Sequence, residues 1–140
     1  CKEAESGDVL QPNHAYLAPG GMHLQLERGP SGPRCVVSVG DLVSGHRPSI
    51  DVLMKSAAEL FGAKCLGVIM TGMGRDGVEG CCAIRNHGGF VLGQDEATSD
   101  VYGMNRVALL EGHVDEQFAL EDGASAIMTY ARQVGTVAAV

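Results

Sequence analysis

The chain has 140 residues, which is enough for one domain and too few for two of ordinary size. Hydrophobic residues make up 45% of the chain and charged residues 19%, so intrinsic disorder is excluded as its main state. The formal net charge of −7 has the wrong sign for a protein that binds phosphates by counterion release, so we expect no nucleic-acid partner.

The first forty residues show short strands separated by turns. Segments 14–18, 23–27 and 35–39 have the composition of strands, and glycine-proline turns separate them. We therefore predict an antiparallel hairpin region. Pro48 and Ser49 then open a predicted helix whose apolar side chains recur every 3.6 residues, and Gly62 ends it.

The middle of the chain predicts a βαβ unit over residues 65–93. The apolar run 65–70 is typical of a strand buried on both faces of a parallel sheet, and a glycine-rich turn follows it. We predict a helix over 78–87 and a second buried strand over 90–93. Later elements are a short helix over 106–111, a strand over 114–118, and a closing helix over 122–133 with Ala126, Ile127 and Tyr130 facing inward.

These patterns predict a single α/β domain over residues 1–140. Its sheet is expected to be mostly parallel and doubly wound, and the domain is expected to contain the antiparallel hairpin as well. We interpret the five cysteines, which form no C-x-x-C pair, as reduced side chains. No apolar run is long enough to span a bilayer and no signal peptide is visible, so we expect a cytoplasmic protein without membrane insertion.

The turn Gly72 to Gly77 is the strongest local motif, and it is open to more than one interpretation. It fits G-x-G-x-x-G between a strand and a helix, with Asp95 at about the distance of a ribose-binding acid, so a dinucleotide-binding module is one alternative. The same glycines also suit a tight turn that presents Asp76 at the carboxyl end of a parallel strand. A third interpretation is that Asp76 only caps the helix that follows it.

Several segments together resemble the catalytic domain of the chemotaxis protein-glutamate methylesterase family. They occur in the family's order and cover nearly the whole chain. The matching stretches are AYLAPG (15–20) with His23, HRPSIDVL (46–53), GVIMTGMGRDG (67–77), GQDEATS (93–99) and VYGM (101–104).

The resemblance implies a Ser-His-Asp hydrolase that removes methyl groups from glutamate esters on chemoreceptors and also deamidates receptor glutamines. It assigns Asp76, in the T-G-M-G-x-D-G loop, as the acid of the triad. It assigns the backbone N–H of Met73 to the oxyanion site, although Met73 could equally be a core residue of a tight loop.

The chain departs from the family pattern because it contains neither the S-T-G-G serine segment nor the Q-H-M histidine segment. We therefore expect an N-terminally incomplete domain, the C-terminal part of a methylesterase catalytic domain, which supplies only Asp76 to the triad. A catalytically inactive binding domain of the same fold is the remaining alternative.

His46 and Arg47 are candidate substrate-binding residues because an arginine presents a bidentate fork to a receptor carboxylate. Arg47 could instead brace a loop by bonding backbone carbonyls, and His23 is expected to be a plain turn histidine. The implied partners are the methylated cytoplasmic helices of a chemoreceptor and an upstream receiver domain. We expect no cofactor and no metal.

Overall fold

The computed structural model describes residues 1–138, and the side chains of residues 1–134. Its strands are β1 (Lys2–Glu3), β2 (Tyr16–Leu17), β3 (His23–Gly29), β4 (Gly32–Ser38), β5 (Leu66–Ile69), β6 (Phe90–Gln94) and β7 (Glu116–Phe118). Its helices are α1 (Ile50–Phe61), α2 (Val78–Asn86), α3 (Met104–Leu110) and α4 (Gly123–Ala138), with short 3₁₀ turns at Gly62–Lys64 and Leu120–Asp122.

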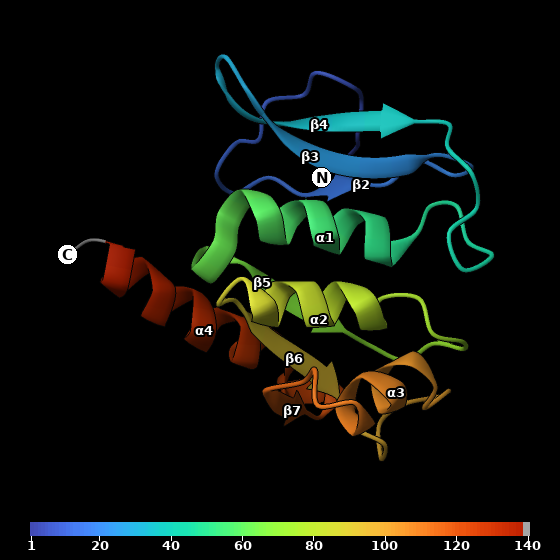
Figure 1. Ribbon diagram of the computed structural model, residues 1–140. Helices are drawn as coiled ribbons and strands as arrows, with labels where there is room; N and C mark the ends of the chain where they lie inside the picture. Colours follow the sequence, from blue (N-terminus) through green and yellow to red (C-terminus); the bar gives the residue numbers. More distant parts are fainter. Residues whose placement is uncertain (139–140) are drawn as a thin grey trace.

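The elements are stacked in layers (Figure 1). The β3–β4 hairpin packs on α1, α1 packs on α2, and α2 covers one face of the sheet formed by β5, β6 and β7. Helix α4 lies on the other face of that sheet, where the ring of Tyr130 stacks on Phe90 with the ring centroids 4.8 Å apart. Helices therefore lie on both faces of the sheet, as the sequence predicts.

The central sheet is wholly parallel, in the order β5-β6-β7. Strand β5 pairs with β6 across the intervening α2, which confirms the predicted βαβ unit. Gly67 of β5 lets α2 approach closely, because a Cβ atom at this position would lie only 2.7 Å from Cδ1 of Ile84.

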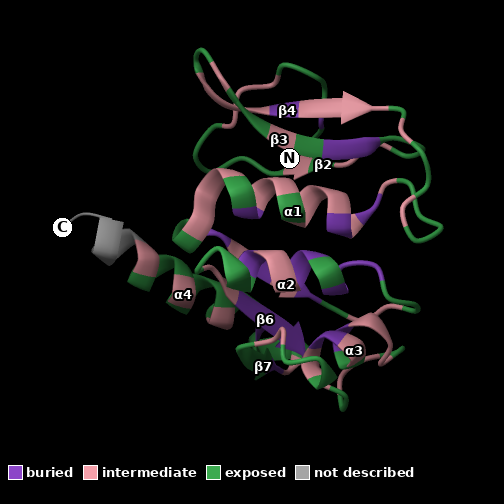
Figure 2. Cartoon of the chain, viewed as in Figure 1, coloured by how far each residue is buried: buried purple, intermediate pink, exposed green. Residues whose placement is uncertain are grey.

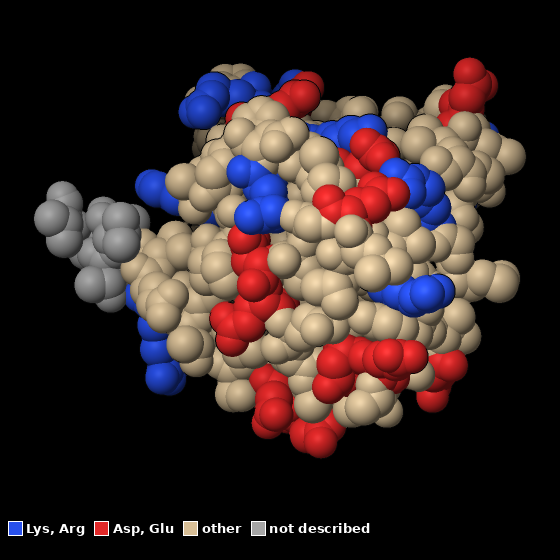
Figure 3. Space-filling view, turned by 60° about the horizontal axis from the view of Figure 1, so that its bottom comes forward, with Lys and Arg blue, Asp and Glu red and all other residues tan. Residues whose placement is uncertain are grey.

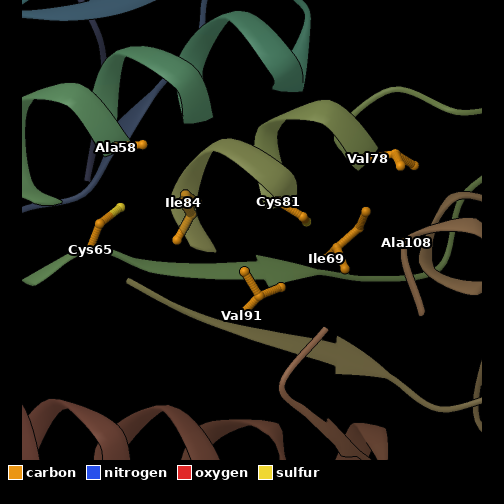
Figure 4. Close-up of a cluster of buried hydrophobic side chains, with 8 residues drawn as sticks. All are labelled: Ala58, Cys65, Ile69, Val78, Cys81, Ile84, Val91 and Ala108. Atoms are coloured by element: carbon orange, nitrogen blue, oxygen red, sulfur yellow. The ribbon is translucent and has the colours of Figure 1, made fainter. Parts of the chain in front are cut away.

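The main core lies between the sheet and the helices α1 and α2 (Figure 4). Each of its valine and isoleucine side chains contributes about 1.5–3 kcal/mol when fully buried. The same elements carry most of the buried positions in Figure 2. The cluster consists of Ala58, Cys65, Ile69, Val78, Cys81, Ile84, Val91 and Ala108.

The hairpin region differs from the prediction in one strand. β3 and β4 form the expected antiparallel hairpin, but β2 pairs in parallel with β1. The outer edge of β4 is already occupied, because Leu10 N–H donates to Pro33 O and Cys35 N–H donates to Asp8 O. The segment around β2 therefore finds its partner at the start of the chain.

The closing helix also differs from the prediction, since Ile127 is 38% exposed. A groove of about 320 Å³ lies between α4 and the strands β6 and β7, and Ala126 and Tyr130 line it whereas Ile127 does not. The inward placement of Ile127 was therefore wrong.

Charged side chains are unevenly distributed over the surface. On the face in Figure 3, acidic side chains gather in the lower half, and basic side chains do not form one continuous patch. None of the helices in residues 1–138 is both long enough and apolar enough to cross a bilayer.

Candidate active site

The candidate site lies in the loop of residues 70–77, at the carboxyl end of β5, where open parallel sheets place their functional groups. A neighbouring segment fixes this loop. Gly72 N–H donates to Val101 O at 3.0 Å, and Met104 N–H donates to Gly72 O at 2.9 Å. Gln94 holds the start of the loop, because its Oε1 accepts Thr71 N–H at 2.8 Å.

Asp76 is 5% exposed, and its carboxylate binds the start of α1. Oδ1 accepts the Ser49 hydroxyl at 2.7 Å and Asp51 N–H at 3.1 Å, while Oδ2 accepts Ile50 N–H at 2.7 Å. Asp76 thus caps α1, which precedes it by 26 residues. The interpretation that it only caps the following helix is wrong.

Asp51 does the same for the other helix. Its Oδ1 accepts Gly77 N–H at 3.0 Å and Gly80 N–H at 2.7 Å, which are donors at the start of α2. Helices α1 and α2 therefore exchange caps, each receiving a carboxylate from the segment of the other. The N-termini of α1 and α2 lie side by side (Figure 1). Both carry partial positive charge, which the buried carboxylates of Asp51 and Asp76 compensate.

The arrangement leaves part of the Asp76 carboxylate open. A carboxylate offers about four lone-pair positions, and three of those on Asp76 are used by the start of α1. The remaining one lies on Oδ2. One further donor, such as the N–H of an imidazole, can therefore bind Asp76 without breaking the helix cap.

The cap exchange excludes the dinucleotide alternative. In that fold the start of the helix after the glycine turn binds a pyrophosphate. Here the negatively charged Asp51 occupies these N–H groups. Asp95 is also engaged, because its Oδ1 accepts both Thr98 N–H and the Thr98 hydroxyl.

The structure decides between the two interpretations of Met73 as far as packing is concerned. Its side chain is 82% exposed, so it is not a core residue. Within residues 1–138, no group accepts a hydrogen bond from Met73 N–H. This N–H is available to a ligand.

His46 and Arg47 lie in the turn that leads to α1. Ser44 and Gly45 both have positive φ, and the turn is closed by two backbone bonds between Val43 and His46. The turn brings His46 beside the candidate loop, since a Cβ atom on Gly74 would lie 3.9 Å from its Nε2. Arg47 donates from Nη1 to Gly40 O at 2.8 Å, so it does brace the loop, with other N–H groups left over.

His23 is more than the turn histidine that the sequence predicts. It is 4% exposed, its Nδ1 lies 3.2 Å from Ser49 N, and its Nε2 lies 2.8 Å from Asp41 O. A backbone N–H can only donate, so Nδ1 is the acceptor and Nε2 carries the proton. Neither His23 nor Asp51 had a local sequence signal for its role, because each acts on residues far along the chain.

Two candidate nucleophiles, Ser49 beside Asp76 and Cys81 on α2, are unsuitable. Ser49 is 2% exposed, and its hydroxyl donates a hydrogen bond to Asp76. Burial, with a further contribution from the negative charge of Asp51, raises the pKa of the Cys81 thiol to about 12, so Cys81 is not a thiolate at neutral pH. Within the described part of the chain, no three His, Cys, Asp or Glu side chains gather as a metal site requires.

Comparisons with known proteins agree with the motif analysis. The family model for CheB methylesterase matches residues 1–127. The chain is 48% identical over 131 residues to protein-glutamate methylesterase/protein-glutamine glutaminase 1 of Caulobacter vibrioides, covering 93% of this chain and 38% of that protein. It is 44% identical over 132 residues to a Treponema denticola protein-glutamate methylesterase/protein-glutamine glutaminase, covering 94% and 36%.

The fold has a counterpart among solved structures. The crystal structure of the Thermotoga maritima CheB methylesterase catalytic domain matches with a TM-score of 0.84 and 30% identity, over 94% of this chain and 66% of that one. The chain spans less than two fifths of the length of the two curated relatives. The family match and these identities show that the chain belongs to the CheB methylesterase family.

Proposed function

We propose that this chain is the part of a protein-glutamate methylesterase that supplies Asp76 to a Ser-His-Asp triad. The reaction is hydrolysis of glutamate methyl esters on chemoreceptors, with deamidation of receptor glutamines as a second activity. The observation that carries the proposal is the buried Asp76 carboxylate, held by three hydrogen bonds with one lone pair left open.

In this mechanism Asp76 accepts a hydrogen bond from one nitrogen of the catalytic histidine and keeps the other nitrogen unprotonated. That nitrogen takes the proton of the serine hydroxyl as the serine oxygen attacks the ester carbonyl. The C–O bond to the methoxy group then breaks, and the imidazolium gives its proton to the methoxy oxygen, which leaves as methanol. A water molecule, activated by the same imidazole, hydrolyses the acyl-enzyme and restores the serine.

The tetrahedral intermediates place negative charge on the former carbonyl oxygen. Met73 N–H is an unpaired backbone donor in the same loop as Asp76, and we assign it to that oxygen. The serine and histidine motifs of the family are absent from these 140 residues, so both groups are proposed to come from a segment outside them.

His46 and Arg47 are proposed to bind the substrate. The position of His46 beside Gly74 supports this role. Arg47 donates one N–H to Gly40 O and can donate others to a carboxylate of the receptor. The receptor surface is expected to be a helical bundle in the cytoplasm, and a receiver domain upstream of residue 1 is the proposed regulatory partner.

The test is methanol release from a chemoreceptor fragment that carries glutamate methyl esters. The complete protein that contains these residues is expected to release methanol, and residues 1–140 alone are expected to release none. Asp95→Asn is the matched control for Asp76→Asn in this assay, because the amide oxygen of the new asparagine can still accept both bonds from Thr98. An inactive complete protein would support a binding domain instead.

A further inference from the structure

We propose that His23 and Ser49 form a buried relay that positions the carboxylate of Asp76. Both would be positioning residues of the esterase reaction, since neither has a free group to offer the substrate. The inference deepens the proposed role of Asp76 and rests on it.

The first step of the relay is an unusual use of the helix N-cap. Ser49 occupies the N-cap position of α1, and a serine there ordinarily accepts a hydrogen bond from its own helix. Its side chain makes no such bond. The hydroxyl instead donates to Asp76 Oδ1 at 2.7 Å, and Asp76 itself supplies the cap.

Ser49 is 2% exposed, so water does not readily replace its hydroxyl. Without it, Oδ1 keeps only the longer bond from Asp51 N–H, at 3.1 Å. The carboxylate is still held at Oδ2 by Ile50 N–H, but with Oδ1 less firmly held it can shift about its terminal torsion, and the direction of the open lone pair of Oδ2 is less sharply fixed. Misplacing a catalytic group by about 1 Å costs roughly 10²-fold in rate.

The second step is the attachment of Ser49 to the hairpin. His23 begins β3, 26 residues before Ser49, and its Nδ1 accepts Ser49 N–H. Its Nε2–H is tied to Asp41 O, which prevents the ring from turning. The ring therefore connects the hairpin layer to the start of α1 and, through Ser49, to Asp76.

The first experiment compares Ser49→Ala with Ser56→Ala in the complete protein. Ser56 is a matched control on the same helix, because its hydroxyl donates to Leu53 O and accepts Leu26 N–H without touching Asp76. Both variants are expected to lower the melting temperature. Only Ser49→Ala is expected to lower kcat, by roughly 10- to 100-fold with KM unchanged.

The second experiment separates the two nitrogens of His23. An asparagine amide reaches about as far as Nδ1, and a glutamine amide about as far as Nε2. His23→Asn can therefore still accept Ser49 N–H, whereas His23→Gln can still donate to Asp41 O. We expect His23→Asn to keep the higher kcat, even if the two variants are equally destabilised.

The outcomes distinguish this inference from the proposed function. If Asp76→Asn abolishes turnover while Ser49→Ala keeps the parental kcat, the relay is wrong and the role of Asp76 stands. If Asp76→Asn also keeps the parental kcat, the proposed catalytic role of Asp76 is wrong, and the relay that rests on it is wrong as well. If Ser49→Ala does not fold, the His23 pair decides, and a higher kcat for His23→Gln overturns the relay.

Discussion

Replacing Asp76 by asparagine is expected to destabilise the fold more than replacing Asp51 by asparagine, although Asp51 is the more buried of the two at 2% against 5% exposure. Asp76 uses both of its oxygens as acceptors. An asparagine has one acceptor oxygen, so in either orientation of the amide at least one backbone N–H of α1 faces an NH₂ group. Asp51 uses Oδ1 alone, and an amide oxygen there can keep both bonds.

The difference can be worked from these contacts. A buried donor left without a partner costs about 1–3 kcal/mol. Loss of the negative charge at a helix N-terminus costs about 0.3–1 kcal/mol, and this contribution is shared by both variants. We expect Asp76→Asn to cost about 1–2 kcal/mol more than Asp51→Asn, which is about 3–8 °C in melting temperature for a domain of this size.

The assay is thermal unfolding followed by circular dichroism, with urea unfolding as an independent measure of the free energy. Asp95→Asn is the control, since both of its bonds lie on one oxygen of a half-buried side chain. If Asp51→Asn proves as costly as Asp76→Asn, burial rather than the number of engaged oxygens governs these carboxylates, and the reasoning is refuted.

Three further predictions follow from packing, charge and strand pairing. The Cβ of Gly80→Ala would lie 2.5 Å from Met54 Cβ. Overpacking of about 1–3 kcal/mol outweighs a helix-propensity gain of about 1 kcal/mol, so this variant is expected to lose about 1 kcal/mol of unfolding free energy in urea. The control Gly20→Ala meets no atom within 4 Å and should leave the unfolding free energy unchanged. The hydrogen bond from Arg75 holds the pKa of Glu111 below its usual 4.5. Arg75→Ala should therefore melt at a lower temperature than the parent at neutral pH, and this difference should disappear as the pH falls below 4.5. A difference that stays the same in acid would contradict the pairing. Strand β5 pairs only with β6 within residues 1–138, so the isolated 140-residue chain is expected to self-associate through this edge, and a monomer in sedimentation would show that the edge is protected.

The elements with strong periodicity could be predicted from the sequence. The apolar stripe and Gly62 give the bounds of α1, and the continuous apolar runs give β5 and β6. Strand β2 was assigned to the wrong partner because two residues carry no information about pairing direction. The exposure of Ile127 depends on which residues of α4 face the sheet, and Ala126 and Tyr130 rather than Ile127 line the groove there.

The chemistry of the site was predictable only in part. The T-G-M-G-x-D-G resemblance points to Asp76 and Met73, but local capping rules assign Asp76 to the helix that follows it and Ser49 to its own helix. Both rules fail because α1 and α2 begin side by side, which lets each helix take its cap from the other segment. The roles of His23 and Asp51 come from contacts between residues 18 or more positions apart, and no local pattern encodes them.

The central claim is that Asp76 is the acid of the esterase triad, and the turnover of Asp76→Asn in the complete protein tests it most directly. Methanol release from a methylated chemoreceptor fragment should be measured well below the melting temperature of the variant, so that lost stability does not mimic lost catalysis. We predict a fall in kcat of roughly 10²- to 10⁴-fold, because the imidazole loses the partner that sets its tautomer. Parental turnover by a folded Asp76→Asn variant would contradict the claim and leave Asp76 as a helix cap alone.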